Sequence, residues 1–404
     1  MGNKSSPKII VLPSFYPMEF NYTRGNFFEE QTRLIRKRGA NVTVIFNENR
    51  SLTSFNLRKL RYIHFQEQFK IEQDIPVLRR MNWNIVPTKF DLGKRIWIKN
   101  SIGLVNSYIK KHGKPDLFHV HCAFNAGCVA KYFKDKLQIP YIVTEHSTFF
   151  AESEISISQK NEVLNIYSNA EKVVAVSRPF RKLLSEKLGF EKNKIDVVPN
   201  FIDTNYFDPG GSINLYRSAK GNIIFTVCHH VYRKRLDRLL DSFKIVAKQY
   251  PYWKLIIGGN GPETNNLKSK AKEFNLQDKI VFTGFLTKEE VKNYMKDASI
   301  FVLPSDEETF GVVVIEAMSM GLPVVATASG GPEDIIKRET GILVERNTDS
   351  LANGILKIIS NYEFYNREGI RLYVVENFSG EAIADKYIEM YSQSTLNRNQ
   401  LLLK

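Results

Sequence analysis

The sequence has little or none of several features that would each assign it to a class of protein. It holds three cysteines, Cys122, Cys128 and Cys228, and no C-x-x-C pair. Such a sparse, odd set argues against a disulfide-framed secreted protein and favours the reducing cytosol. No run of about 18 apolar residues occurs, so we expect no membrane-spanning helix. A G-x-x-x-x-G-K-[ST] motif is also missing, which excludes a P-loop nucleotide site.

Acidic residues are too few to balance the basic ones. Lysine and arginine number 57 against 43 aspartates and glutamates, which gives a formal net charge of +14. An excess of this size favours partners that carry phosphate, namely nucleotides, nucleic acid or an anionic membrane. Apolar residues make up 43% and charged residues 25% of the 404 positions. This is ordinary globular composition, and the length suits two or three domains.

Short apolar runs alternate with amphipathic stretches along the whole chain. The runs are rich in valine and isoleucine without polar alternation, as expected of parallel strands covered on both faces. Strands and helices in alternation predict a doubly wound α/β sheet. A first set of strands is expected at Lys8–Leu12, Asn41–Phe46, Leu117–His121, Tyr141–Thr144, Lys172–Val176 and Lys194–Val198. A second set is expected at Asn222–Val227, Trp253–Gly258, Lys279–Thr283, Ser299–Leu303, Pro323–Thr327 and Gly341–Val344.

The densest turn cluster, Asp-Pro-Gly-Gly-Ser at 208–212, separates the two sets of strands and predicts a break between two Rossmann-like domains. We expect an N-terminal domain over residues 1–205 and a C-terminal domain over 206–378. A last helix, Ser379–Tyr391, precedes a polar tail that we expect to fray, and 379–404 is expected to pack back on the first domain. Because open α/β sheets bind ligands beyond the carboxyl ends of their strands, two facing sheets predict one central cleft.

The segment richest in candidate chemistry follows the strand that ends at Leu303. It passes a polar loop, Ser305–Thr309, and opens a helix near Gly311. Glu308 lies in the loop, and Glu316 follows inside the helix. Carboxylates so placed can bind the vicinal hydroxyls of a sugar or a ribose, at about 1.5–3 kcal/mol for each charge-assisted hydrogen bond. The helix start adds N–H groups for a phosphate. A solvated acidic loop beside an incidental helical glutamate is the alternative.

A glycine turn, Gly-Gly-Asn-Gly-Pro-Glu at 258–263, joins a strand to a helix. This arrangement is typical of turns that contact a phosphate or nucleotide, here through Gly259 and Gly261. The motif is incomplete, because Thr264 stands where G-x-G-x-x-G has its third glycine.

A basic turn and a second glycine turn also lie between strand and helix. Lys234, flanked by Arg233 and Arg235, lies where a cation can reach a diphosphate, although an ordinary solvated helix start has the same pattern. The Ser-Gly-Gly-Pro-Glu turn at 329–333 repeats the strand–glycine–helix arrangement.

Taken in order, these motifs resemble the retaining glycosyltransferases of family 4, whose fold is the two-domain GT-B fold. The resemblance runs along nearly the whole chain. Its N-terminal motifs are PSFYP (13–17), TRGNFFEEQ (23–31), RGANVTVI (38–45), TEHS (144–147), VVAVS (173–177) and VVPNFID (197–203). Its C-terminal motifs are KRLDRLLDSF (234–243), GNGPE (259–263), FTGFL (282–286) and the segment with Glu308 and Glu316.

The resemblance implies roles for individual residues. Glu308 would hold hydroxyls of the donor sugar, and Glu316 would hold the nucleotide ribose. Lys234 would bind the donor diphosphate, which the backbone of Gly25 would approach from the other domain. His146 would lie near the donor sugar and the acceptor. Lys234, Glu308 and His146 are therefore the expected catalytic residues. Further donor contacts are expected from Arg233, Gly259, Gly261, Thr309, Phe310 and Gly311.

One departure from the family pattern concerns charge. The family often has an arginine on the diphosphate where this chain has Cys228-His229-His230. A histidine is at most partly charged at neutral pH. We therefore expect His229 to contact the donor while Lys234, aided by Arg233, supplies most of the positive charge.

Two histidines, His119 and His121, lie two residues apart beside Cys122. On a strand they share a face and lie at the end of the sheet. Three interpretations stay open, namely a zinc site, a lining of the acceptor cleft and a purely structural role. We expect no metal, and we place His121 and Glu145 on the acceptor side.

The resemblance also implies the reaction. A hexose-type sugar would pass from a UDP- or GDP-sugar to a glycan or lipid-linked acceptor, with retention of anomeric configuration, in surface polysaccharide biosynthesis. No cofactor and no metal are expected, and the leaving phosphate would assist the acceptor hydroxyl. Two alternatives are a sugar-nucleotide epimerase of the same fold and a non-catalytic basic protein that binds membranes or nucleic acid. Nothing resembles a nucleic-acid module, so no nucleic acid is expected.

The positive charge is concentrated in residues 57–114, where 13 basic residues meet 4 acidic ones and aromatic residues are interleaved. We hypothesise that this stretch docks on an anionic membrane face that carries the acceptor. The protein would then be cytoplasmic and peripheral on the inner face of the cell membrane. A solvated helical surface with core aromatics is the alternative.

Overall fold

The computed structural model describes residues 6–18, 25–51, 65–84, 91–210 and 222–401, which form two compact units. The first unit comprises residues 1–176, 181–198 and 383–404, and the second comprises 177–180 and 199–382. The chain thus leaves the first unit after Val198, earlier than the expected boundary at 205, and returns to it at Ile383. Each unit is built on its own largely parallel sheet, which confirms the predicted fold class.

The first unit holds an eight-stranded sheet in the order β3-β4-β2-β1-β5-β6-β7-β8. Its neighbouring strands are parallel except for β3 and β4, which are antiparallel. The strands are β1 (Lys8–Pro13), β2 (Asn41–Ser51), β3 (Glu67–Glu72), β4 (Ile75–Asn84), β5 (Leu117–His121), β6 (Tyr141–Glu145), β7 (Lys172–Ala175) and β8 (Ile195–Val197). All five residues of β5 and of β6 are buried, as both faces of the sheet are covered.

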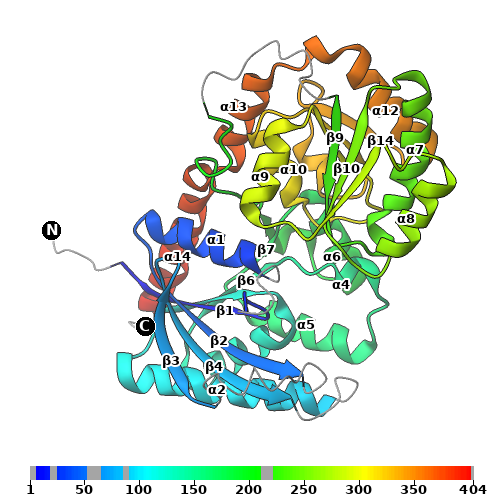
Figure 1. Cartoon of the computed structure of the whole chain (residues 1–404). Coiled ribbons are helices and arrows are strands. Elements are labelled where there is room, and N and C mark those ends of the chain that lie inside the picture. Colours follow the sequence, from blue (N-terminus) through cyan, green and yellow to red (C-terminus); the bar gives the residue numbers. More distant parts are fainter. Residues whose placement is uncertain (1–5, 19–24, 52–64, 85–90, 211–221, 402–404) are drawn as a thin grey trace. The chain divides into compact units, whose positions relative to one another are not determined.

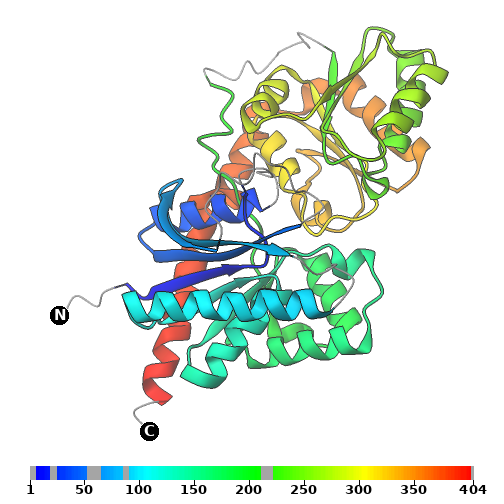
Figure 2. The same cartoon turned by 60° about the horizontal axis from the view of Figure 1, so that its bottom comes forward.

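Helices cover both faces of this sheet. Helix α1 lies on one face and the long helix α2 on the other (Figures 1 and 2). Helix α14 lies on the face of α1, since Arg38 at the end of α1 pairs with Asp385 of α14 at 2.6 Å. The helices of the unit are α1 (Asn26–Lys37), α2 (Asp91–His112), α3 (Cys128–Leu137), α4 (Phe149–Glu152), α5 (Ile157–Asn169), α6 (Arg178–Leu188) and α14 (Gly380–Leu401).

Two features of the first unit differ from the expectations. Residues 67–84 form the hairpin β3–β4 at the edge of the sheet, although they fall in the stretch 57–114, for which a solvated helical surface was the alternative to membrane docking. The final helix α14 continues to Leu401, ten residues past its expected end at Tyr391 and into the tail that was expected to fray. The helix continues because its buried tyrosines, Tyr387 and Tyr391, fix it to the sheet, and no proline or glycine follows to end it.

The second unit holds a six-stranded, wholly parallel sheet in the order β11-β10-β9-β12-β13-β14. Helices α7, α8 and α12 lie on one side of it and α9 and α10 on the other (Figure 1). The strands are β9 (Ile223–Val227), β10 (Lys254–Gly258), β11 (Ile280–Gly284), β12 (Ile300–Leu303), β13 (Val324–Thr327) and β14 (Gly341–Val344). The helices are α7 (Leu236–Gln249), α8 (Thr264–Glu273), α9 (Lys288–Asp297), α10 (Val312–Ser319), α11 (Pro332–Ile335), α12 (Thr348–Ser360) and α13 (Arg367–Phe378).

Helix α7 shows why the sequence folds as it does next to the candidate site. Leu236, Leu239, Leu240, Phe243 and Val246 recur at helical spacing and are all buried. Burying each such side chain stabilises the fold by about 1.5–3 kcal/mol. The helix is therefore fixed on the sheet, and so is the turn that leads into it. None of the described helices is long and apolar enough to cross a membrane.

Candidate functional site

The order of the strands in the second unit brings two candidate loops together. Strands β9 and β12 are neighbours although β10 and β11 separate them in the chain. The turn after β9 therefore lies beside the loop after β12 at the carboxyl ends of the strands. The turn after β9 carries Lys234, which lies in a 3-10 turn over Tyr232–Lys234. The loop after β12 carries Glu308.

Lys234 and Glu308 are in direct contact. The Nζ atom of Lys234 donates a hydrogen bond to Oε1 of Glu308, and the hydroxyl of Ser305 donates to the same oxygen at 2.8 Å. The two charged side chains are only 14% and 10% exposed. The structure thus brings together two of the three predicted catalytic residues. Both of these contacts fall on Oε1 of Glu308.

The backbone of Glu308 is fixed by the glycine turn that follows β13. Its N–H donates to the carbonyl of Ser329 at 2.8 Å, and its own carbonyl accepts from the N–H of Gly331 at 2.8 Å. A Cβ on Gly331 would lie 2.1 Å from Cα of Phe310. The turn at 329–333 was predicted from its resemblance to phosphate-binding turns, but these contacts show that it holds the loop of Glu308.

The glycine turn after β10 is also held by the protein itself. The N–H of Gly259 donates to the carbonyl of Gly284 at 2.8 Å, and that of Gly261 donates to the hydroxyl of Thr264 at 2.9 Å. A Cβ on Gly259 would lie 2.0 Å from the carbonyl oxygen of Cys228. Both glycines are thus required by the close approach of two backbone segments, and their N–H groups are already engaged.

His230 is a residue that the sequence analysis gave no role. Its Nδ1 lies 2.9 Å from the hydroxyl of Thr264 and its Nε2 lies 3.2 Å from the carbonyl oxygen of Gly258. The side chain is fully buried, and this burial lowers its pKa. The neutral ring therefore ties the end of β9 to the glycine turn. The only sequence signal was its place directly after His229 and before the basic turn.

His229 differs from its neighbour because it is exposed. Partial burial, and then the positive charges of Arg233 and Lys234, lower its pKa. The ring is accordingly neutral at pH 7, which agrees with the expectation that Lys234 carries the positive charge at this position.

The remaining predicted donor residues lie at the start of α10. Gly311 has φ +96° and precedes the first turn, where an α-helix leaves its N–H groups without helical partners. The carbonyl of Thr309 accepts from the hydroxyl of Ser177 at 2.7 Å. Phe310 is 1% exposed and packs against Phe378, so only its backbone can meet a ligand. Glu316 lies further along α10 and is half-buried.

The other predicted residues lie in the first unit. Gly25 has φ +85° at the start of α1, and a Cβ there would lie 3.0 Å from the carbonyl oxygen of Phe15. In the first turn of α1, the rings of Phe27 and Phe28 lie 5.3 and 4.8 Å from the ring of His146, centre to centre. The glycine loop and His146 are thus joined through α1.

His146 is joined to His121 by a buried hydrogen bond. Nδ1 of His121 lies 3.0 Å from Nε2 of His146, and the two side chains are 2% and 5% exposed. Burial lowers the pKa of His121 to about 3, so the ring is neutral at pH 7. One of the two nitrogens is protonated and donates the hydrogen bond, and the other nitrogen accepts the bond. His121 is therefore placed to orient His146.

Glu145, which we predict to lie on the acceptor side, is held by contacts within the first unit. Its carboxylate accepts from the N–H groups of Ala123, His146 and Ser147 at 2.9, 3.1 and 3.0 Å. The hydroxyl of Tyr167 donates to it as well, at 3.2 Å. The side chain is fully buried, and burial raises its pKa. Both oxygens are thus taken by groups that shape the ends of β5 and β6.

His119 completes a polar network that reaches the C-terminal helix. Its Nδ1 lies 2.7 Å from the hydroxyl of Tyr391, and its Nε2 lies 2.9 Å from that of Thr144. The hydroxyl of Thr144 is in turn 3.4 Å from that of Tyr387. These contacts support the structural interpretation of His119, whose buried side chain is fully occupied. Among the described residues, no group of three or more histidine, cysteine, aspartate or glutamate side chains could hold a metal ion.

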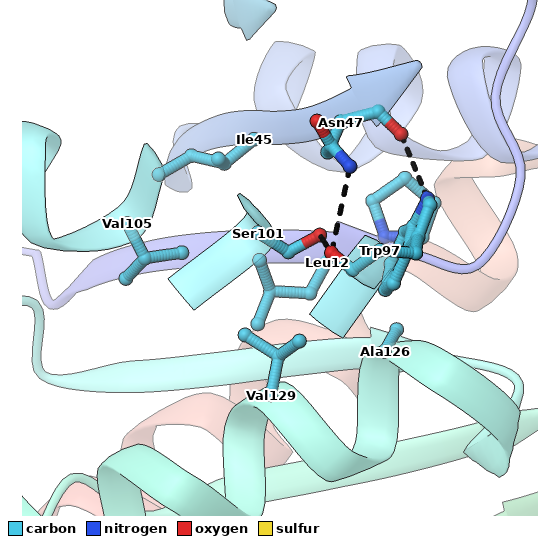
Figure 3. A pocket seen from close by; sticks show the side chains of 9 residues that line it. Leu12, Ile45, Asn47, Trp97, Ser101, Val105, Ala126 and Val129 are labelled. Carbon is cyan, nitrogen blue, oxygen red and sulfur yellow. Dashed lines mark hydrogen bonds between the residues drawn. The ribbon is translucent and has the colours of Figure 1, made fainter. Parts of the chain in front are cut away.

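A small hollow lies between α2 and the strands β1 and β2 (Figure 3). Asn47 and Trp97 face each other across it, and Nε1 of Trp97 donates to the carbonyl of Asn47 at 2.9 Å. Its volume is about 10 Å³, which is close to the least that a single water needs. The hollow therefore offers no room for a substrate.

Comparisons with known proteins agree with this geometry. The model of Glycosyltransferase Family 4 matches residues 25–206, and that of Glycosyl transferases group 1 matches residues 215–373. An uncharacterized glycosyltransferase of Methanocaldococcus jannaschii is 32% identical over 269 residues, which cover 64% of this chain and 71% of that one. A putative teichuronic acid biosynthesis glycosyltransferase of Bacillus subtilis is 25% identical over 88% of this chain and 89% of its own. The structure of HepE from Anabaena with UDP has a TM-score of 0.71 at 18% identity and covers 96% of this chain and 100% of its own.

Proposed function

This chain belongs to the group 1 glycosyl transferases with the GT-B fold, and from that premise we propose that it is a retaining hexosyltransferase. The donor is a UDP- or GDP-sugar and the acceptor is a glycan or a lipid-linked glycan of a surface polysaccharide. The buried contact of Lys234 with Glu308 is the observation that carries the proposal. It places a cation and a carboxylate side by side at the carboxyl ends of two parallel strands.

Each charged side chain of the proposed donor site has its own role. Breaking the bond between the sugar and the diphosphate builds negative charge on the leaving phosphate. Lys234 neutralises that charge, and the N–H groups at the start of α10 add hydrogen bonds to it. Glu308 accepts from hydroxyls of the sugar through Oε2, and Glu316 accepts from those of the ribose. The complex of HepE with UDP supports a nucleotide donor by analogy alone.

The stereochemical part of the proposal rests on what Glu308 already contacts. Before the donor binds, Glu308 takes hydrogen bonds from Lys234 and Ser305, so its carboxylate is held as an anion that can accept from hydroxyls. We therefore assign it the binding of sugar hydroxyls, and the leaving phosphate takes the proton of the acceptor hydroxyl on the same face. His146, held by His121, orients the reacting groups. Lys234 and the helix start supply the positive charge, so the reaction proceeds without a metal.

The acceptor half of the proposal concerns the basic stretch 57–114, of which residues 65–84 and 91–114 are described. Arg79, Arg80 and Lys94 form ion pairs with glutamates, at 2.7, 2.5 and 2.5 Å, so part of the charge is neutralised within the unit. Other side chains of the described part of this stretch are exposed, and we call them together the basic surface: Lys70, Lys99, Lys110, Phe65, Phe69, Ile71 and Leu92. We propose that this surface holds the protein on an anionic membrane face.

A transfer assay tests the proposed reaction. The purified chain is incubated with UDP- and GDP-sugars and a lipid-linked oligosaccharide fraction, and release of nucleoside diphosphate and sugar transfer are followed together. We expect transfer from one donor, with a product of unchanged anomeric configuration by NMR, and a loss of about 10²–10³ in rate for Lys234→Met. Product of inverted configuration would refute retention. Failure of the chain to float with anionic vesicles at low salt would refute the membrane proposal.

A further inference from the structure

The two loops that carry Lys234 and Glu308 need a support of their own. Lys234 lies in a short 3-10 turn, which has weaker hydrogen bonds than an α-helix, and its side chain is a flexible four-carbon stem. Glu308 lies in a loop outside the strands of the sheet, where an isolated β-bridge with Gly330 holds its backbone. Their mutual contact is exchangeable, because phosphate oxygens compete for the ammonium group and sugar hydroxyls compete for the carboxylate.

Asp306, two residues before Glu308, supplies this support. Its carboxylate accepts from Nη1 of Arg235 at 3.0 Å and from Nη2 of Arg238 at 2.6 Å. Its N–H donates to the carbonyl of Arg233 at 2.8 Å. Asp306 thus binds the basic turn on both sides of Lys234. Before Lys234 it binds the backbone carbonyl of Arg233, and after Lys234 it binds the side chain of Arg235.

The two arginines are themselves held in place. Arg238 is 4% exposed, and its Nη1 donates to the carbonyl of Pro304 at 3.0 Å. Arg235 makes two bonds of 3.0 Å to Asp237 and lies over the ring of Tyr232. Because both carboxylate oxygens of Asp306 are occupied by guanidinium groups, a donor does not compete for them as it does for Glu308.

We propose that Asp306, with Arg235 and Arg238, is a positioning residue that fixes Lys234 and Glu308 relative to each other at the carboxyl ends of β9 and β12. It touches neither the diphosphate nor the sugar. We call the hydrogen bonds of Asp306 to Arg233, Arg235 and Arg238 the clamp. When the donor separates Lys234 from Glu308, the clamp keeps the two loops in the same relative position. The inference that the pair receives a donor rests on the proposed function, whereas the clamp itself rests on the contacts of Asp306.

The first test measures the clamp without any ligand. Lys234 is 14% exposed, so an amine-acetylating reagent should label it slowly, and the exposed Lys248 serves as an internal reference in mass spectrometry. Asp306→Asn should raise the labelling rate of Lys234 several-fold relative to Lys248. Asp241→Asn is the matched control, since Asp241 also accepts from a cation, Lys270 at 2.7 Å, and has similar exposure at 34% against 28%. An unchanged rate in Asp306→Asn would overturn the proposal.

The second test measures the consequence for the donor. Asp306→Asn should weaken binding of the nucleotide-sugar that the wild type binds by about tenfold or more, and Asp241→Asn should leave it unchanged. In a protein that already carries Lys234→Met, Asp306→Asn should change the affinity for the nucleotide-sugar little, because Asp306 acts by positioning Lys234 against Glu308. Equal losses in both backgrounds would show a general structural role and overturn the proposal. The remaining outcome is that Asp306→Asn speeds the labelling of Lys234 while the wild type binds no nucleotide-sugar. This result would support the clamp and refute the proposed function.

Arg235→Met covers the case in which Asp306→Asn does not fold, as judged by circular dichroism. It removes one guanidinium from Asp306 and leaves the bond from Arg238 in place. The labelling rate of Lys234 should rise in the same direction and by less. A rate equal to that of the wild type would overturn the proposal as well.

Discussion

His121 and His146 are joined by one hydrogen bond of 3.0 Å between two ring nitrogens, and neither side chain is more than 5% exposed. They lie at the carboxyl ends of neighbouring parallel strands, since His121 ends β5 in register with Thr144, and His146 directly follows β6. A buried pair of this kind resists protonation, because burial removes the water that would solvate a charged ring and so lowers the pKa of His121. The stability of the protein should therefore depend on pH through His121.

The first prediction follows from the sign of that shift. The pKa of His121 is lowered to about 3 in the folded protein, from about 6.5 in the unfolded chain. As the pH falls below 6.5 the unfolded state binds a proton that the folded state does not, so the free energy of unfolding decreases. One such group removes about 2 kcal/mol between pH 7 and pH 5. Urea unfolding should show a smaller decrease over this range for His121→Asn than for the wild type. Equal decreases would contradict the assignment.

The second prediction separates the sugar from the diphosphate. Glu308→Gln should lower the affinity for the nucleotide-sugar about 10- to 100-fold, as expected from losing one charge-assisted hydrogen bond. The affinity for the free nucleoside diphosphate should stay equal or rise, because Lys234 loses its carboxylate partner. Lys234→Met should weaken both ligands. Titration calorimetry with the two ligands decides the matter, and a parallel loss for both in Glu308→Gln would exclude a sugar contact.

The third prediction concerns a glycine required by packing. A Cβ on Gly261 would lie 2.4 Å from the carbonyl oxygen of His230, so Gly261→Ala should lower the free energy of unfolding by about 1–3 kcal/mol. Gly369→Ala is the control in the same unit, because its Cβ would meet nothing closer than 3.7 Å. Thermal unfolding should show a clearly lower stability for Gly261→Ala than for Gly369→Ala. Equal stabilities would contradict the claim that packing requires a glycine at position 261.

The fourth prediction concerns metals. If Lys234 and the start of α10 neutralise the leaving group, prolonged treatment with EDTA should leave the transfer rate within about twofold of the untreated protein. Addition of Mg²⁺ or Mn²⁺ after gel filtration should not change it further. A rate that is lost with EDTA and restored by one cation would contradict this part of the account.

The sequence predicted both sheets because most strands are short, continuous apolar runs rich in valine and isoleucine, as expected of buried parallel strands. It missed the β3–β4 hairpin because Glu67–Glu72 at the edge of the sheet holds only two apolar residues, Phe69 and Ile71, and both are exposed. Such an exposed edge strand has the composition of a solvated helix. Strand β2 also extends to Ser51, five residues beyond the apolar run that indicated it.

The site was predicted as a set of residues but not as a set of contacts. Lys234 and Glu308 meet because β9 and β12 are neighbours, an order that does not follow from their sequence. The contact of His121 with His146 depends in the same way on the register of β5 and β6. The glycines at 259 and 261 were predicted as donor contacts, and the structure adds that the close backbone of Cys228 and His230 leaves no room for a side chain at either position.

The central claim is that the second unit binds a nucleotide-sugar between Lys234, Glu308 and Glu316. Thermal unfolding with a panel of UDP- and GDP-sugars tests it most directly, with Glu316→Ala as the control. A ligand at about 100 times its dissociation constant adds about 2.7 kcal/mol of stability. We predict a clear rise in Tm with one nucleotide family, and loss of that rise in Glu316→Ala. No rise with any of them, or a rise that Glu316→Ala retains in full, would contradict the account.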